Sequence, residues 1–143
     1  MRKTLIFVTC SLLLTSLLSC DKLFVHISGR EVDLQGKWKM DDDLVYYNFQ
    51  NSLFRYQMYQ NENQMRAGYG YYTLYGDTYL ELRLLQGHTT AWLMNHLSNS
   101  DWETLPSSTG EQDTIIKTYK VEKFTKKELI LSFDDEKVSF HKF

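Results

Sequence analysis

Hydrophobic and polar side chains alternate along most of the chain after residue 33. The clearest run is 78–85 (TYLELRLL), in which leucines point to one face while Glu81 and Arg83 point to the other. A period of two predicts a β-strand that buries one of its faces. Runs of this kind, most of them ending at residues that favour turns, cover 34–40, 44–50, 53–60, 64–75, 78–85, 115–124, 128–133 and 137–143. The pattern therefore predicts an all-β fold with eight sequential strands.

Such a series of antiparallel strands closes most simply into an up-and-down β-barrel, because closure removes exposed sheet edges. The alternation breaks at residues 86–114, which contain the only proline. In this segment Thr89 or Thr90 is a candidate cap for a short helix that carries Trp92 and Leu97. A loop of this length in a small β domain is often a lid or a binding loop. A packed excursion that closes one end of the barrel is the alternative.

The first 19 residues combine a basic start with an apolar stretch, as secretory signal peptides do. The stretch ends in LLSC, residues 17–20, which resembles the lipobox of bacterial lipoproteins. The resemblance implies that Cys20 carries a diacylglycerol and anchors the chain in membrane lipid. An ordinary signal peptide cut near Ser19, which leaves Cys20 as a free thiol, is the alternative.

The expected domain boundaries follow from this start. We expect a lipoprotein signal peptide over 1–19, a lipid-anchored tether over 20–33 and one barrel domain over 34–143. The 124 residues from 20 to 143 are enough for one domain with a hydrophobic core and too few for two. A disordered spacer is the alternative for the tether.

The net charge and the N-terminal targeting sequence limit the kinds of partner that we expect for this protein. Loss of the signal removes Arg2 and Lys3 and changes the formal net charge from −2 to about −4. A slightly acidic chain without a basic face excludes a nucleic-acid partner. We expect a lipid-anchored protein of a bacterial cell envelope, with the outer membrane favoured and a periplasmic domain, since no acidic run follows Cys20. Asp21 resembles an inner-membrane retention signal of some bacteria, which keeps that membrane as the alternative. The pattern predicts no oligomeric state.

The first strand contains Gly36-x-Trp38, preceded by Leu34. Together with the hairpin segment GYGYYTLYGDTYLEL and the closing ELILSFDDEKVSFHKF, this motif resembles the lipocalin-like domains of small bacterial lipoproteins. The resemblance spans roughly residues 34–143 and implies that Trp38 packs across the closed end of a barrel against a basic side chain from a late strand. The late strands offer Lys120, Lys137 and Lys142. A second resemblance, through L-x-G-x-W, is to the small domain of bacterial heat-shock-associated lipoproteins.

The polar residues form no catalytic motif. The chain has no G-x-S-x-G serine and no glycine-rich phosphate loop, and no cysteine remains for nucleophilic work once the signal and the anchor are set aside. We therefore expect no enzymatic activity and no cofactor. His88 and His96 are eight positions apart, with Asp101 and Glu103 following, and this spacing matches no compact metal-ligand pair. We expect solvated histidines and no metal site.

The aromatic residues are the remaining candidates for a binding function. Tyr69, Tyr71 and Tyr75 share one face of the run 64–75, and we expect them to line the barrel interior together with Trp92. Apolar walls with a few hydroxyl groups are typical of small-molecule sites. This interpretation predicts a small apolar or amphipathic ligand. The alternative is a barrel filled by its own rings that binds a protein partner through the long loop or an exposed tyrosine face.

Overall fold

The computed structural model of the chain describes residues 29–110 and 112–143. The predicted signal peptide, Cys20 and most of the predicted tether lie outside the described residues. Contacts divide the chain between Val32 and Asp33, and the barrel described below is the unit from Asp33 to Phe143.

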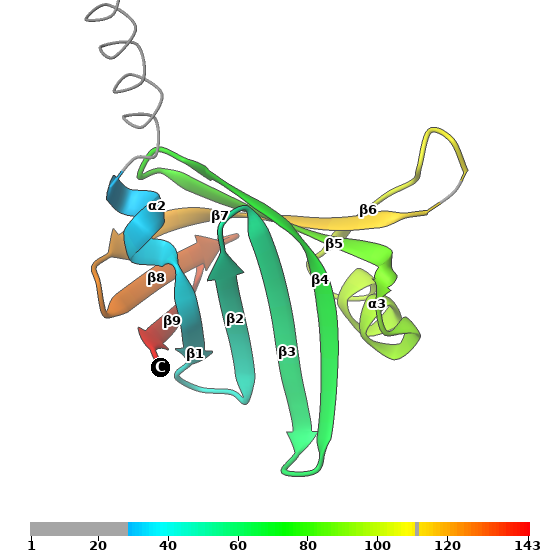
Figure 1. Ribbon diagram of the computed structural model, residues 1–143, viewed down its shortest axis with the longest axis horizontal. Coiled ribbons are helices and arrows are strands. Elements are labelled where there is room, and N and C mark those ends of the chain that lie inside the picture. The colour runs from blue at the N-terminus through cyan, green and yellow to red at the C-terminus, as the bar shows by residue number, and fades with distance from the viewer. Residues whose placement is uncertain (1–28, 111) are drawn as a thin grey trace, which may run out of the picture. The chain divides into compact units, whose positions relative to one another are not determined.

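Strands dominate this unit (Figure 1). They are β1 (Gly36–Met40), β2 (Val45–Gln50), β3 (Leu53–Asn61), β4 (Gln64–Tyr75), β5 (Tyr79–Thr89), β6 (Glu103–Leu105), β7 (Thr114–Phe124), β8 (Glu128–Phe133) and β9 (Glu136–Lys142). The helices are α2 (Gly29–Leu34), which spans the division between the two units, and α3 (Ala91–Ser98), which lies beside β4 and β5.

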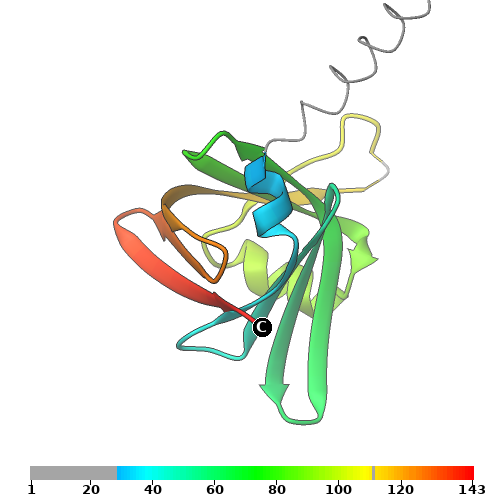
Figure 2. The same cartoon turned by 60° about the vertical axis from the view of Figure 1, so that its left-hand side comes forward.

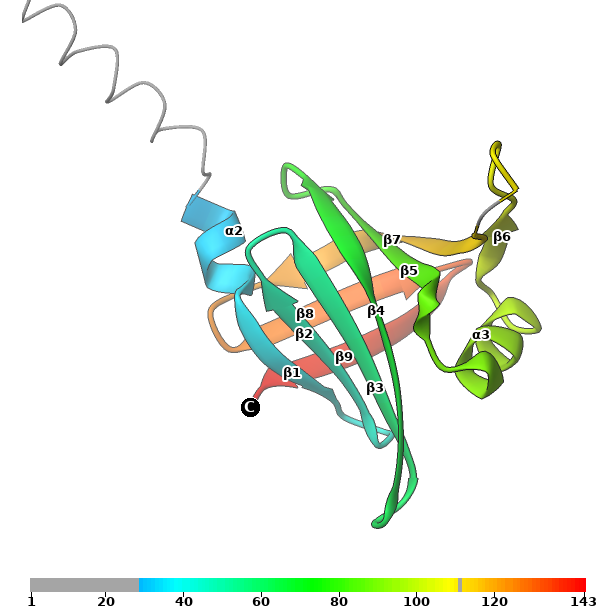
Figure 3. The same ribbon diagram turned by 45° about the vertical axis from the view of Figure 1, so that its right-hand side comes forward.

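The strands form one closed antiparallel barrel. Each strand from β1 to β5 pairs with the next in sequence, β5 pairs with β7, and β7 continues through β8 to β9. The pairing of β1 with β9 closes the barrel, and the sheet curls round accordingly in Figures 2 and 3. The predicted eight-stranded up-and-down barrel is therefore confirmed, with β6 as an additional short strand.

The edge of β7 that faces away from β5 is shared by two strands. On this edge β8 pairs with residues 120–124 and β6 pairs with residues 114–116. The two ladders leave residues 117–119 between them, while β5 pairs along the opposite edge of the same residues. This interruption lies beside the cavity described below.

Most expected strands agree with the structure to within two residues, and two differences remain. Residue 34 ends α2 and does not begin β1, and β5 runs four residues beyond the expected 85. The short helix predicted after Thr90 is present as α3. The Thr90 carbonyl accepts a hydrogen bond from the Met94 amide at 2.9 Å, but its side chain makes no capping bond.

The glycine face of β4 points into the barrel. A side chain at Gly70 would place its Cβ 1.8 Å from the carbonyl oxygen of Arg83, because the β5 backbone passes directly over this position. Tyr72, two residues on, is buried on the same face. The prediction that the tyrosines on the other face line the interior is therefore wrong, since only glycine allows this close approach of β5.

Trp38 fills one end of the barrel, here called the closed end. Its indole is fully buried and donates a hydrogen bond from Nε1 to the Leu34 carbonyl at 2.8 Å. The Nζ of Lys142 lies 5.2 Å from the centre of the indole ring and donates a hydrogen bond to the Asp33 carbonyl at 2.8 Å. Of the three lysines that the resemblance offered as partners of Trp38, Lys142 is thus the one in contact.

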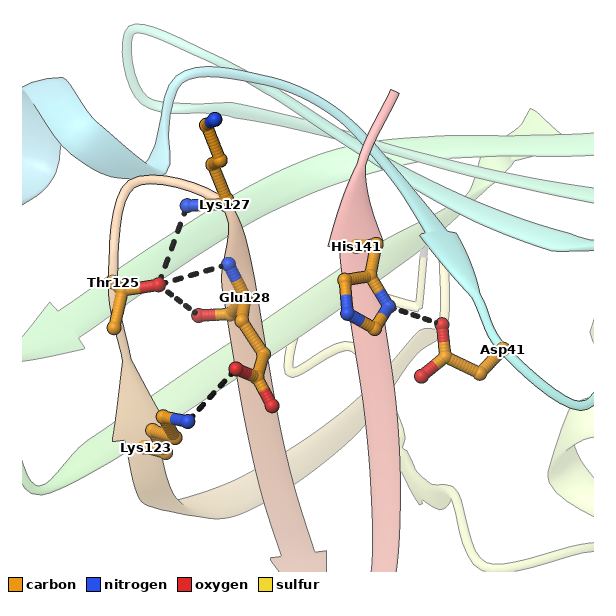
Figure 4. Close-up of polar contacts among 6 residues, drawn as sticks. All are labelled: Asp41, Lys123, Thr125, Lys127, Glu128 and His141. Carbon is orange, nitrogen blue, oxygen red and sulfur yellow. Dashed lines mark hydrogen bonds and ion pairs between the residues drawn. The ribbon is translucent and has the colours of Figure 1, made fainter.

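Side-chain contacts reinforce the seam between β1 and β9 and the turn beside it (Figure 4). His141 on β9 lies with Nδ1 2.6 Å from Oδ1 of Asp41, which accepts a hydrogen bond just beyond the end of β1. In the β7–β8 turn, Thr125 Oγ1 accepts hydrogen bonds from the backbone amides of Lys127 and Glu128, at 3.3 and 3.0 Å. These groups are exposed, so we expect each to contribute about 1 kcal/mol or less.

Candidate functional site

A cavity of about 260 Å³ opens at the end of the barrel opposite Trp38, here called the open end. Met40, Val45 and Met58 come to it from β1, β2 and β3, and Phe133 and Val138 come from β8 and β9. Buried hydrophobic side chains pack against one another in the interior of the barrel. Among the residues that the structure describes, these side chains occupy much of the interior, and this cavity opens beside them.

Three tyrosines form the inner wall of the cavity. Tyr47, Tyr56 and Tyr119 are buried on β2, β3 and β7, and all three line the space. The hydroxyl oxygens of Tyr47 and Tyr119 are 3.1 Å apart and share a hydrogen bond. Burial raises the pKa of the Tyr47 hydroxyl well above its ordinary value, and nearby Tyr119 and Tyr56 add to the effect. Burial likewise raises the pKa of Tyr56, with contributions from Tyr119 and Asp43. These groups are neutral hydroxyls at physiological pH.

The segment between β5 and β7 covers the cavity from one side. His96 and Leu97 of α3 line it, followed by Ser100, Asp101 and Trp102. The Trp102 ring meets the Tyr56 ring edge to face, with centroids 6.0 Å apart, and is almost fully buried. This part of the long loop is thus a packed wall of the cavity.

Lys117 is the charged residue that enters the cavity wall most deeply. It lies on β7 between the buried residues Ile115 and Tyr119, and its side chain is only 11% exposed. The sequence interpretation did not single out this residue. The sequence nevertheless indicates its position, because the alternation of Ile115, Lys117 and Tyr119 places a lysine on the inward face of a strand. An inward charge on such a strand is an informative departure from the pattern.

The residues predicted to bind a ligand lie elsewhere. Tyr69, Tyr71 and Tyr75 are on the outer face of β4, each about half exposed. Tyr69 and Tyr71 meet at a separate hollow of about 240 Å³, which Leu53 and His88 also line. They do not line the barrel interior, as the close approach of β5 to Gly70 requires. A role of these tyrosines in ligand binding stays a prediction.

Trp92 is also directed away from the barrel interior. On α3 it stacks against His96, with ring centroids 4.8 Å apart and an interplanar angle of 11°. Arg66 lies over the same indole, 5.5 Å from its centre. The buried side of the helix consists of Leu93 and Leu97. The helical spacing therefore places the two leucines, and not the tryptophan, toward the core.

The described residues can also be searched for metal sites and for membrane-spanning helices. Within residues 29–110 and 112–143, no group of three or more His, Cys, Asp or Glu side chains is arranged to hold a metal ion. In the same ranges, no helix combines the length and the apolar character that crossing a bilayer requires. The prediction that Cys20 carries lipid falls on residues outside these ranges.

Known proteins share this architecture. A family model described as a lipocalin-like domain matches residues 15–143. A lipocalin-like protein from Bacteroides uniformis is 24% identical, with a TM-score of 0.59 over 78% of this chain and 99% of its own. An uncharacterized protein from Bacteroides eggerthii is 26% identical, with a TM-score of 0.54 over 77% of this chain and 99% of its own. No curated protein matches the chain.

Proposed function

The chain belongs to the lipocalin-like domain family, and from this premise we propose that it binds a small apolar or amphipathic molecule in the cavity at its open end. The role we propose is binding and not catalysis. The single observation that carries the proposal is the cavity of about 260 Å³, which opens beside a core of buried hydrophobic side chains. Proteins close-pack their interiors, so a space of this size at the wall of a core needs an explanation.

The lining of the cavity supports this proposal. Apolar side chains such as Val45, Met58 and Leu97 stand beside three tyrosine hydroxyls and one inward lysine. Sites for small molecules combine apolar side chains with polar groups that orient the ligand, and this lining offers both, including charged residues such as Asp101 and Glu136. The cavity volume of about 260 Å³ is just below the roughly 300 to 1,000 Å³ of typical ligand pockets, so the proposed ligand is small.

Native mass spectrometry of the purified full-length chain tests this function. We expect a co-purified small molecule that is lost from Val138→Phe, since the larger ring fills a position on the cavity wall. The matched control is Val121→Phe, because Val121 is also partly buried against the core but does not line the cavity. Retention of the molecule by Val138→Phe, with loss from the control, would contradict the proposed site.

We further propose that the barrel works in a bacterial cell envelope, anchored through acylated Cys20. The basic start, the apolar stretch and the LLSC sequence support this anchor. Acyl chains contribute about 0.8 kcal/mol for each buried CH₂ group, so two or three chains on one cysteine hold a protein at a membrane. We favour the outer membrane, with the barrel on the periplasmic side.

A protein-binding role is the second candidate, and the outer face of β4 favours it. Tyr75 of β4 pairs across the hairpin with Tyr79 of β5, and Leu53 of β3 pairs with Tyr71, so two pairs of exposed apolar side chains lie along the outer face of β4. Exposed tyrosines of this kind are enriched in protein interfaces. The contact would leave the cavity free.

A photo-crosslinking side chain at Tyr71 in cells tests the second candidate. We expect a discrete crosslinked protein from this position and none from Thr118, which is exposed on β7. Equal crosslinking from both positions would contradict a docking role for the tyrosine face.

A further inference from the structure

Lys117 places its ammonium group beside two aromatic rings in the cavity wall. Its Nζ lies 4.8 Å from the centre of the Tyr119 ring and 4.7 Å from the centre of the Phe133 ring. Both rings line the cavity with it. Two ring faces stabilise an ammonium group in part, but they do not replace the hydration that burial removes. The lysine is therefore positioned for an anionic partner.

The carboxylate that approaches Lys117 within the chain is a weak partner. Oδ2 of Asp101 is 3.7 Å from Nζ, beyond the usual length of a charge-assisted hydrogen bond. The Asp101 side chain is 59% exposed, whereas that of Lys117 is 11% exposed. Asp101 follows α3 in the cavity-lining part of the loop, so its carboxylate reaches toward the lysine from the solvent side.

Other charges at the cavity lie at its rim. Asp43, Glu136 and Lys137 line the space, but all three are exposed. Water screens exposed charges strongly, so they discriminate between ligands less than a desolvated group does. Lys117 is two residues from Tyr119 on the same face of β7, and both residues line the cavity. An anion held by Lys117 thus shares the cavity with the tyrosines of its inner wall.

We propose that Lys117 is the specificity-determining residue of the cavity, that it selects a small amphipathic carboxylate, and that Asp101 occupies the position of the ligand carboxylate while the cavity is empty. This inference rests on the proposed binding function. The ligand carboxylate displaces Asp101 from Lys117, and its short apolar part lies among Val45, Met58 and Leu97. No covalent step is involved.

Calorimetry of the full-length chain with hexanoate, 1-hexanol and hexylamine tests the inference, because these probes share an apolar part and differ in charge. We expect hexanoate to bind at least about tenfold more tightly than hexanol, a difference of about 1.4 kcal/mol. Lys117→Met should abolish this preference. Lys120→Met is the matched control, since Lys120 lies on the same strand with a side chain 57% exposed, and it should keep the preference. Thermal unfolding of each variant confirms that it is folded.

Asp101→Asn should have the opposite effect to Lys117→Met on the preference for hexanoate. Removal of the competing carboxylate should tighten hexanoate binding severalfold and leave hexanol binding unchanged. Equal binding of hexanoate and hexanol, or tightest binding of hexylamine, would overturn the inference while the proposed binding function stands. Failure of all three probes to bind the wild-type chain would overturn the inference and count against the proposed function as well.

Discussion

The ammonium group of Lys142 lies 5.2 Å above the indole of Trp38 and closes one end of the barrel. Gly36 leaves room for this contact, because a Cβ at this position would lie 3.2 Å from Cε of Lys142 and the lysine would have to shift. Gly36 also has φ of +110°, which favours glycine. The Gly36-x-Trp38 motif is thus the local requirement for a lysine that crosses over a buried tryptophan.

Loss of the Trp38 ring should destabilise the fold strongly. Trp38→Ala removes a fully buried side chain and should lower the free energy of unfolding by about 3 to 5 kcal/mol. Denaturant unfolding measures this value. Trp92→Ala, which removes a partly exposed indole, should lower it far less. A loss below about 1 kcal/mol for Trp38→Ala would mean that the closed end does not depend on this ring.

Gly36→Ala should lower the free energy of unfolding by about 1 to 3 kcal/mol, because alanine is strained at this backbone conformation. Gly76→Asn is the control. Its φ of +57° is one that asparagine tolerates, and no atom lies within 4 Å of the position a Cβ would take. Equal stability of both variants in urea would show that Gly36 is not conformationally required.

Gly70→Ala should disturb the β4–β5 pairing, since the new Cβ would fall 1.8 Å from the Arg83 carbonyl oxygen and the backbone must move. We expect a loss of about 2 kcal/mol or more, together with faster amide hydrogen exchange at Arg83 and Leu84. Thr73→Ala, at an exposed position of the same strand, should change stability by less than about 0.5 kcal/mol. Unchanged exchange at Leu84 would contradict this account.

The cavity tyrosines should make stability depend on alkaline pH. Folding raises the pKa of Tyr47 and Tyr56, chiefly by burial, so the folded chain keeps protons that the unfolded chain loses above about pH 10. The stabilising contribution is fully present below that pH and is lost as the pH rises above it. Urea unfolding between about pH 8 and about pH 11 measures the slope. The double variant Tyr47→Phe, Tyr56→Phe should show a smaller slope, and an identical slope would assign the effect to other groups.

The proposed lipid anchor leads to a prediction that can be tested in cells. Cys20→Ala should move the protein from the membrane fraction to the soluble fraction, because the thioether site for acylation is lost. Cys10→Ala, within the predicted signal peptide, should leave the distribution unchanged. Fractionation followed by immunodetection measures both. A Cys20→Ala protein that stays membrane-bound would contradict the anchor.

Alternation of side chains was enough to predict the barrel strands, because each half-buried strand carries its own period of two. The leucine face of β5 and the Glu81–Arg83 pair followed directly, and Nε of Arg83 lies 2.8 Å from Oε1 of Glu81. In β4 both faces carry residues that are compatible with burial. The pattern therefore predicts a strand but not which of its two faces points into the barrel. The orientation depends on how closely β5 approaches Gly70, which is a tertiary contact.

The candidate site was harder to predict for the same reason. The cavity depends on which inward side chains meet at one end of a closed barrel, and three of them are on β2, β3 and β7. Tyr47, Tyr56 and Tyr119 lie in different runs, and no local motif connects them. Of these cavity residues, Lys117 alone can be recognised from the local sequence, because it is a charged residue at an inward position of a strand.

The short strand β6 affects how much of the β7 edge is open to another protein chain. An unpaired strand edge is a template on which another chain can add a strand, and long free edges lead to aggregation. By pairing with residues 114–116, β6 covers the start of the β7 edge that β8 leaves open. The part of this edge that neither β6 nor β8 covers is three residues long, from Lys117 to Tyr119. It is too short to hold a strand of another chain in register. The segment that walls the cavity thus also shortens the free edge of β7 on which another chain could add a strand.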